Sequence, residues 1–344
     1  MAGYATQLGN ARNGQASGYP TVWRTADYEY CIVTRLDWHI LICQRPRSGT
    51  SWTVVDVTNI ALTGAYDPTF GPVEVSDSHY AVSMAVDGQG YIHLSGNMHQ
   101  EPMKYIKSVN PHDISAWAQA PNPSNWLVSG ADVSTYQAYE VFSDGTLIWI
   151  QDQSDTLNPV GRDQTMWRLG PNPGDTWEPC LGTGEIMSTI NLGVNNLADT
   201  DSVPDRAYML NLFVDKNDTL HCVFVWRIET NDPATMQEHF YVRSHDKGST
   251  WENVLGEAVS APFTYRQILD GVNGVGVAAI RVNGVSIKGS GTGGRCVDKD
   301  GNFHYVAWGS GVNDSSDFPQ ITPGNLHNHI WWDGTAWQIE QIIG

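Results

Sequence analysis

The 344-residue sequence carries 37 acidic against 19 basic side chains, a net charge of −18, which repels phosphate backbones and argues against nucleic acid as a partner. No apolar run of about 18 residues occurs, so we expect no membrane insertion, and residues 1–6 lack the basic-then-apolar pattern that begins a signal peptide. With 34 Gly and 17 Pro the chain is rich in turns, which predicts few helices.

Taken in chain order, the sequence repeats one unit, in which a turn opens a strand, a second strand follows, and a Trp closes the unit. The first copy has strands at residues 30–33 and 40–43 and ends at Trp52. Four further copies open with a polar, Gly-containing or Asn-containing turn, at residues 87–94, 143–149, 215–222 and 298–305. Their second strands are expected at residues 103–107, 166–168, 240–243 and 329–332, followed by Trp117, Trp177, Trp251 and Trp337.

Five such units predict an all-β protein, a β-propeller of four-stranded antiparallel blades. The count is about five blades, and six or seven is the alternative if a further set of strands lies within residues 252–290. Because no linker or low-complexity segment separates the units, we expect a single domain over residues 1–344. Large amphipathic rings suit packing between sheets, so the following residues are expected between or within blades: Trp52, Trp177, Trp251 and Trp337.

The sharpest single motif is Ser-x-Asp-x-Gly-x-Thr-Trp at residues 244–251. It fits the Asp box of sialidase-like propellers. We interpret it as structural, with Ser244 and Asp246 capping a tight hairpin turn while Trp251 packs between sheets. The motif supports the repeat without indicating a chemistry.

One blade resembles a known family more specifically. Residues 77–80, 87–93 and 96–108 are similar to the blade that carries the active site in ulvan-lyase-type polysaccharide lyases, which belong to the proteins with BNR-like repeats. The resemblance extends over roughly residues 30 to 340, with the specific motifs between residues 77 and 136. It implies β-elimination of a uronic-acid-containing polysaccharide, in which the carboxylate is neutralised, the C5 proton removed and the leaving oxygen at C4 protonated.

By this resemblance, His79 and His99 correspond to the paired active-site histidines of the family, and Tyr136 to its catalytic tyrosine. His79 opens a strand and His99 follows the strand that begins at Tyr91, so strand alternation allows both to emerge at one end of the blade. The alternative is that they are satisfied loop histidines. Three other histidines share one position in the repeat and are interpreted as structural: His93, His221 and His304.

The expected substrate-binding residues are Asn97, Lys104, Gln151, Arg162 and Arg227. Two positions depart from the family: Tyr80 stands where Asn is usual, and Gln151 stands where the family has Arg. The second departure matters more, because a neutral amide cannot reproduce the charged bidentate grip of a guanidinium on a carboxylate. Arg162 and Arg227 are candidates to supply that charge.

Three functions are compatible with these residues. The first is a polysaccharide lyase acting on an acidic polysaccharide. The second is a non-catalytic propeller that binds a surface glycan, such as an attachment module on a virion or cell surface that could assemble into a larger particle. The third, a protein–protein scaffold, leaves the histidine blade unexplained. No cofactor is expected, no motif specifies a metal site, and an extracellular or virion-associated location is favoured over a cytoplasmic one.

Overall fold

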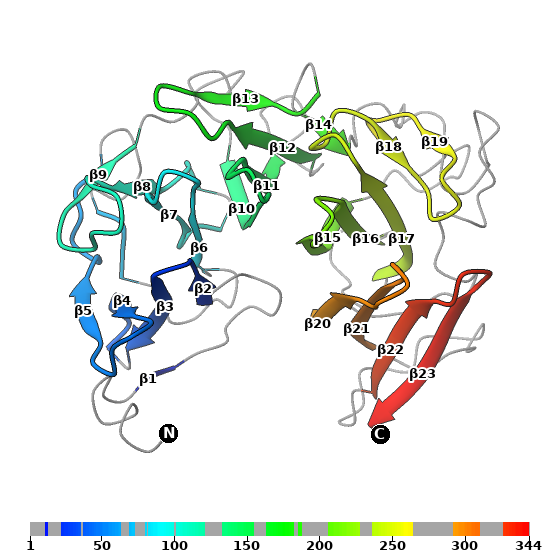
Figure 1. Ribbon diagram of the computed structural model, residues 1–344, viewed down its shortest axis with the longest axis horizontal. Coiled ribbons are helices and arrows are strands. Elements are labelled where there is room, and N and C mark those ends of the chain that lie inside the picture. Colours follow the sequence, from blue (N-terminus) through cyan, green and yellow to red (C-terminus); the bar gives the residue numbers. More distant parts are fainter. Residues whose placement is uncertain are drawn as a thin grey trace. The chain divides into compact units, whose positions relative to one another are not determined.

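The computed structural model describes residues 11–12, 22–35, 37–62, 69–72, 80, 82–99, 101–120, 133–154, 163–181, 185–187, 206–227, 236–263, 292–309 and 326–343. Every element in these ranges is a β-strand, and the described strand pairings are antiparallel (Figure 1). The chain divides into two compact units, residues 1–156 with 167–178, and residues 157–166 with 179–344. The single domain over residues 1–344 stays a prediction.

The first unit contains two complete sheets and most of a third. The first sheet has the order β1-β3-β4-β5, with β2 also beside β3, and comprises β1 (Ala11–Arg12), β2 (Val22–Arg24), β3 (Tyr28–Arg35), β4 (Ile40–Pro46) and β5 (Thr53–Asp56). The second runs through β6 (Val82–Val86), β7 (Ile92–Gly96), β8 (Tyr105–Ser108) and β9 (Trp117–Gln119). The third runs through β10 (Val133–Val141), β11 (Leu147–Ser154), β12 (Asp163–Leu169) and β13 (Trp177–Pro179), with β14 (Glu185–Met187) beside β12.

The division between the units falls within β12, and two further sheets lie in the second unit. One runs through β15 (Arg206–Val214), β16 (Leu220–Arg227), β17 (Met236–Ser244), β18 (Trp251–Glu252) and β19 (Ala258–Val259). The other runs through β20 (Thr292–Val297), β21 (Phe303–Gly309), β22 (Leu326–Trp332) and β23 (Trp337–Ile343). The described residues therefore form five antiparallel sheets, which confirms the predicted all-β class and the count of about five blades. Of residues 252–290, where a further strand set was considered, the described part contributes β19 to the fourth sheet, and residues 264–290 lie outside the described ranges.

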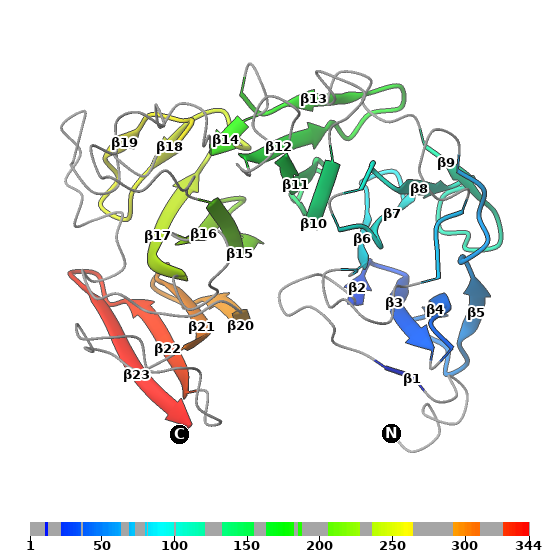
Figure 2. The ribbon, with the colours of Figure 1, turned by 180° about the vertical axis from the view of Figure 1, so that it is seen from behind.

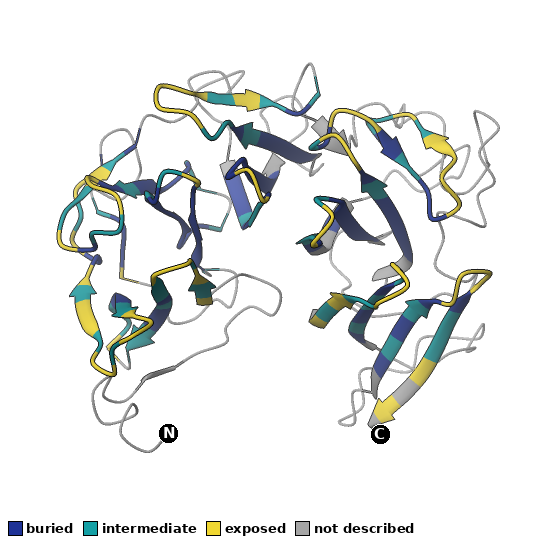
Figure 3. Cartoon of the chain, viewed as in Figure 1, coloured by how far each residue is buried: buried dark blue, intermediate teal, exposed yellow. Residues whose placement is uncertain are grey.

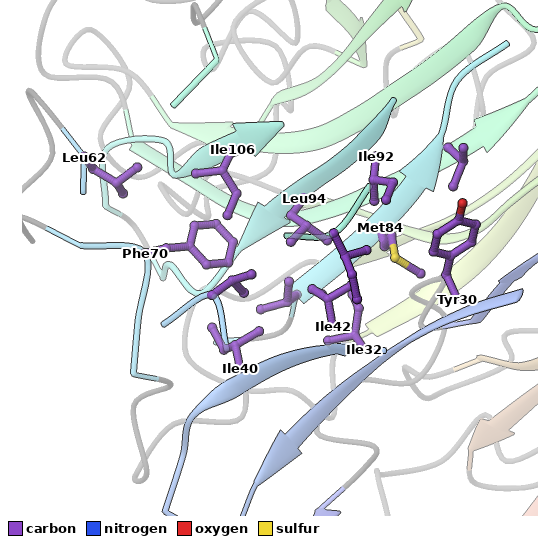
Figure 4. Packing of buried hydrophobic residues seen from close by; sticks show 14 residues of the cluster. Tyr30, Ile32, Ile40, Ile42, Leu62, Phe70, Met84, Ile92, Leu94 and Ile106 are labelled. Atoms are coloured by element: carbon purple, nitrogen blue, oxygen red, sulfur yellow. The ribbon is translucent and has the colours of Figure 1, made fainter. Parts of the chain in front are cut away.

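Two apolar cores hold the sheets of the first unit together. One joins the first two sheets and includes Ile32, Ile42, Met84 and Leu94, all buried, with Phe70 in the same cluster (Figure 4). These two sheets are seen side by side in both the front view and the back view (Figure 1 and Figure 2). The opposite face of the second sheet packs on the third through a cluster that includes the following aromatic residues: Tyr105, Tyr139, Trp149, Trp167 and Trp177. Burial is concentrated on the inner strands, whereas β5 is largely exposed (Figure 3).

The repeated turns share one hydrogen-bonding arrangement between a turn aspartate and a histidine. In the second sheet, Asp87 Oδ1 accepts from the backbone N–H of Gln89 and Tyr91, both at 2.9 Å. Six residues after the aspartate, His93 is fully buried, with Nε2 3.0 Å from Asp87 Oδ2 and Nδ1 2.6 Å from Tyr105 Oη. A neutral imidazole that donates from Nε2 and accepts at Nδ1 satisfies both contacts.

A similar arrangement of aspartate and histidine recurs in the second unit. His221 is buried, with Nδ1 2.6 Å from Tyr241 Oη and Nε2 3.5 Å from Asp215 Oδ2. In the last sheet, His304 Nδ1 lies 2.9 Å from His329 Nε2, and His304 Nε2 lies 3.4 Å from the carboxylate of the turn residue Asp298. These contacts agree with the interpretation of the three repeat histidines as structural, which stays a prediction.

The Trp residues of the repeat lie where large rings are needed between sheets. Trp177 donates from Nε1 to Tyr105 Oη at 3.3 Å, which links the third sheet to the second. Trp337 stacks edge-on against Tyr241 with ring centroids 5.3 Å apart, which links the two sheets of the second unit. Trp52 packs on a small cluster within the first sheet and lies under the Arg45 guanidinium at 5.0 Å. These positions agree with the predicted packing.

The motif at residues 244–251 folds as a capped hairpin turn. Ser244 Oγ accepts from the Gly248 N–H at 2.9 Å, and the Asp246 carboxylate accepts from both the N–H and the hydroxyl of Thr250 at 2.7 Å. Trp251 is buried and donates from Nε1 to Gly248 O at 3.1 Å. These contacts show how the turn is held, while its assignment as an Asp box still rests on the sequence pattern.

The repeat histidines predict an acid-sensitive fold. Burial lowers the pKa of His93 and His221, and burial together with the neighbouring His304 lowers the pKa of His329. Since the unfolded chain titrates near the ordinary value of about 6.5, the unfolded state binds protons first as the pH falls. The contribution of these neutral histidines to the unfolding free energy is therefore complete above about pH 6.5. It is lost as the pH falls from about 6.5 to the folded-state pKa values, by up to about 1.4 kcal/mol per pH unit for each histidine.

Urea titrations between pH 8 and pH 5 would check this expectation. His93→Gln should flatten the dependence of the unfolding free energy on pH while lowering its value at pH 8, because the buried hydrogen bonds are lost. His245→Gln, which changes a histidine with a largely exposed side chain, serves as the control. Equal slopes for the wild type and His93→Gln would contradict the assignment.

Candidate active site

The loop after β7 holds several of the predicted site residues. Asn97 is buried and has a left-handed backbone with φ of 57°. Its Nδ2 donates to Phe70 O at 2.7 Å and to Pro72 O at 3.0 Å, whereas no hydrogen-bond partner is found for its buried Oδ1 within the described residues. Asn97 therefore anchors the start of the loop and retains an acceptor.

His99 lies two residues further along this loop and is half-buried. The ring of Tyr80 meets it edge-on, with centroids 6.3 Å apart and an interplanar angle of 88°. Tyr80 Oη donates to Glu101 Oε1 at 2.7 Å, and Glu101 Oε2 lies 3.2 Å from Lys104 Nζ. The lysine side chain is 1% exposed, so its ammonium is committed to a buried ion pair.

Tyr136 lies on β10 at an irregularity of the strand. Thr135 pairs with Asp152 and Ala138 with Ile150, so Tyr136 and Gln137 together oppose a single residue of β11. This is a β-bulge, and Tyr136 has a φ of 53° within it. A non-glycine residue in the left-handed region costs about 1–3 kcal/mol, and such strain gathers at functional sites. The bulge aims a half-buried tyrosine away from the regular alternation of the strand.

The residue opposite the bulge is Gln151, whose side chain is buried. Its Oε1 accepts from Ser134 Oγ at 2.8 Å, and Ser134 Oγ accepts from Gln137 Nε2 at 3.1 Å. Ser83 Oγ on β6 donates to Gln137 O at 2.6 Å, which ties the bulge to the second sheet. The Gln151 amide oxygen is thus used in supporting the bulge.

Five of the predicted residues lie in the first unit: Asn97, His99 and Lys104 in the loop between β7 and β8, Tyr136 on β10 and Gln151 on β11. Two predicted residues, His79 and Arg162, lie outside the described residues. Arg227 ends β16 in the second unit and pairs with Arg206; its side chain is not among those described.

Sequence reasoning missed Glu101 and Ser134. Glu101 lies within the similar stretch at residues 96–108, and its opposite charge three residues before Lys104 is the signal that could have found it. Ser134 carries no signal in the sequence, because its role depends on the register of β10 against β11.

Within the described ranges, no group of three or more His, Cys, Asp or Glu side chains is placed to hold a metal ion. The same ranges contain no helix long and apolar enough to cross a membrane.

Five antiparallel sheets built from one repeated unit, with a histidine loop and a strained tyrosine on neighbouring sheets, define a repeat-built β-propeller with a candidate site on its second and third blades. A model of the BNR repeat-containing family matches residues 30–343. The chain belongs to that family.

Solved structures show the same fold. An ulvan lyase of polysaccharide lyase family PL25 has a TM-score of 0.67 at 15% identity, over 98% of this chain and 74% of that chain. An ulvan lyase of the same family bound to -[GlcA(1-4)Rha3S]- gives a TM-score of 0.66 at 15% identity, over 97% and 73%. The polysaccharide lyase Uly1 gives 0.62 at 14% identity, over 98% and 77%. No curated protein matches the chain.

Proposed function

We propose that this protein is a polysaccharide lyase that cleaves a uronic-acid-containing polysaccharide by β-elimination. The observation that carries the proposal is Tyr136, held at a φ of 53° in a β-bulge on the sheet next to the His99 loop. Strain of this kind persists only where the surrounding contacts enforce it, and Ser134, Gln137 and Gln151 supply those contacts. Support also comes from the similar PL25 lyase, which was solved with a glucuronic-acid-containing saccharide bound.

In the proposed reaction Tyr136 is the proton-transfer group at the scissile bond. The C5 proton is removed, its electron pair forms the C4–C5 double bond, the C4–O4 bond breaks and the leaving oxygen takes a proton. A tyrosine with an ordinary pKa near 10 is a poor base at neutral pH unless positive charge favours the phenolate, whereas a histidine near 6.5 serves directly. We therefore assign His79 as the partner base or acid.

His99 is assigned to orient the substrate and to stabilise negative charge. As an imidazolium it would face the carboxylate whose charge grows as the C5 proton leaves, which is where a fixed donor lowers the barrier most. Asn97 offers its buried Oδ1 as an acceptor for a sugar hydroxyl. Lys104 and Gln151 are assigned as supports of the site, because both are buried and bonded within the protein. Arg162 and Arg227 stay predictions as carboxylate ligands.

A second function is favoured by one observation, the burial of Gln151 against Ser134. Without a guanidinium at that position the site loses a bidentate grip on a carboxylate. Under this alternative the protein binds an acidic polysaccharide or a surface glycan without cleaving it, as an attachment module on a virion or cell surface.

Incubation with ulvan, alginate, pectin and glycosaminoglycans tests the two functions against each other. We expect absorbance from the new unsaturated uronate in at least one of the four. Calorimetric binding of the same polymers without any absorbance change would instead establish the binding function, and neither signal would defeat both.

A further inference from the structure

Three separate segments of the first unit meet at Glu101. Tyr80, which precedes β6, donates to its carboxylate, and Lys104 of the same loop pairs with that carboxylate. The backbone carbonyl of Glu101 accepts from the Ser134 N–H at 2.9 Å, forming an isolated bridge to the third sheet. One residue therefore joins the segment before β6, the His99 loop and the strand that carries Tyr136.

Burial makes Glu101 and Lys104 depend on each other. Lys104 is 1% exposed and Glu101 is 23% exposed. A buried ammonium is tolerated only when it is paired and hydrogen-bonded, and removing one partner of such a pair leaves an uncompensated buried charge. Lys104 and Glu101 thus hold each other in place, and the second oxygen of the carboxylate accepts from Tyr80 Oη.

The contacts pass from Glu101 to His99 through Tyr80. The hydroxyl of Tyr80 is held at 2.7 Å from the carboxylate, and its ring meets the His99 imidazole at 88°. On the other side, the Ser134 N–H is bonded to Glu101 O two residues before Tyr136. The position of His99 relative to Tyr136 therefore depends on Glu101.

We propose that Glu101 is the positioning residue of the candidate site, which sets the geometry of His99 against Tyr136 while its charge is held by Lys104. This inference rests on the proposed function for its kinetic consequences, but its structural content can be tested without activity. Tyr80 contacts the His99 ring, and Glu101 and Lys104 follow from the hydroxyl of Tyr80. Tyr136 and Asp152 lie on β10 and β11 of the next sheet, and β10 packs against β6 and β7.

The structural test is an NMR titration of the His99 imidazole in three variants. Glu101→Gln leaves the positive charge of Lys104 and should lower the pKa of His99, whereas Lys104→Met leaves the negative carboxylate and should raise it. A single charge in a partly buried site produces shifts of about 0.5 to 1 pH unit. The double variant, which combines Glu101→Gln with Lys104→Met, removes both charges. It should return the pKa of His99 to within about 0.3 unit of the wild type.

The kinetic test uses Tyr80→Phe, which keeps the ring and both charges, because the single charge variants can fail to fold. We expect kcat to fall about 10-fold with little change in KM, since loss of the hydroxyl contact lets His99 shift from its productive position. The double variant keeps an amide acceptor for Tyr80 and should recover activity lost in Glu101→Gln. Glu178→Gln, which removes an exposed glutamate paired with Arg168, is the matched control.

The outcomes separate the inference from the proposed function. Absence of elimination in the wild type overturns the proposed function, while the titration still decides whether Glu101 governs His99. Movement of the His99 pKa in the same direction in Glu101→Gln and Lys104→Met, or no movement in either, overturns the positioning role. An active protein in which Tyr80→Phe matches Glu178→Gln in kcat overturns its kinetic consequence.

Discussion

Tyr136→Phe is expected to lower the rate of β-elimination by about 10²–10⁴-fold, the range typical for loss of a general acid–base group. The substitution keeps the aromatic ring, so the half-buried contacts of the side chain and the bulge that aims it are retained. Only the oxygen that carries the proton is lost. The measurement is the initial rate of unsaturated uronate formation, with the urea midpoint recorded for the same preparation.

Tyr91→Phe is the matched control for this variant. Tyr91 lies in the turn before β7, with Lys107 Nζ 4.1 Å from its ring centroid, and that contact survives loss of the hydroxyl. We expect its elimination rate to stay within about two-fold of the wild type, as for a surface change away from reacting atoms. A Tyr136→Phe rate equal to that of Tyr91→Phe would remove Tyr136 from the chemistry and leave the histidines as the proton-transfer groups.

The repeat could be predicted from the sequence because its determinants are local. An aspartate in the turn and a histidine six residues later lie on the same hairpin, so their contact follows from the turn and the alternation of one strand. The Trp that closes each unit is also local. The contacts of Asp87, His93 and Tyr105 in the second sheet agree with that prediction.

The candidate site was predictable only in its residue types. The strain at Tyr136 comes from a register shift of β10 against β11, which no spacing within either strand encodes. The role of Glu101 depends on Tyr80, Lys104 and Ser134, and Ser134 comes from the next sheet. Lys104 was expected to bind substrate as part of a cationic pocket, but its burial against Glu101 is a tertiary property. Polar networks of this kind are specified between sheets, where sequence patterns carry little information.

The second and third sheets are also joined at the end opposite to the His99 loop. There the turn before β7 meets the turn before β11, and Gly88 N–H donates to Gly145 O at 3.1 Å. A Cβ at Gly88 would lie 2.6 Å from Gly145 Cα, and one at Gly145 would lie 2.5 Å from Gly88 Cα. A new Cβ at either glycine would therefore collide with backbone atoms of the other, and no flexible side chain is present that could move to make room. Together with the bond between Glu101 and Ser134, this contact joins the sheets that carry His99 and Tyr136 at both ends.

Three alanine substitutions separate steric conflict from backbone strain at this contact. Gly174→Ala, at a φ of 92° with no atom near a new Cβ, tests strain alone and should cost about 1–2 kcal/mol of unfolding free energy. Gly88→Ala tests the conflict alone and should cost about 1–3 kcal/mol. Gly145→Ala, at a φ of 89°, combines both and should cost about 3–5 kcal/mol. Urea unfolding monitored by Trp fluorescence measures all three.

The contact also predicts a functional difference between these variants. Gly88→Ala must push the two turns apart, so the sheets rotate and the distance between His99 and Tyr136 changes; misplacements of this kind cost about 10²-fold in rate. Gly174→Ala lies in the turn before β13 and leaves the contact between the two turns intact, so it should keep the wild-type rate per folded molecule. If Gly88→Ala unfolds at the wild-type urea concentration, the two turns are not in contact as described. If it is destabilised but fully active, the contact between the two turns does not control the site.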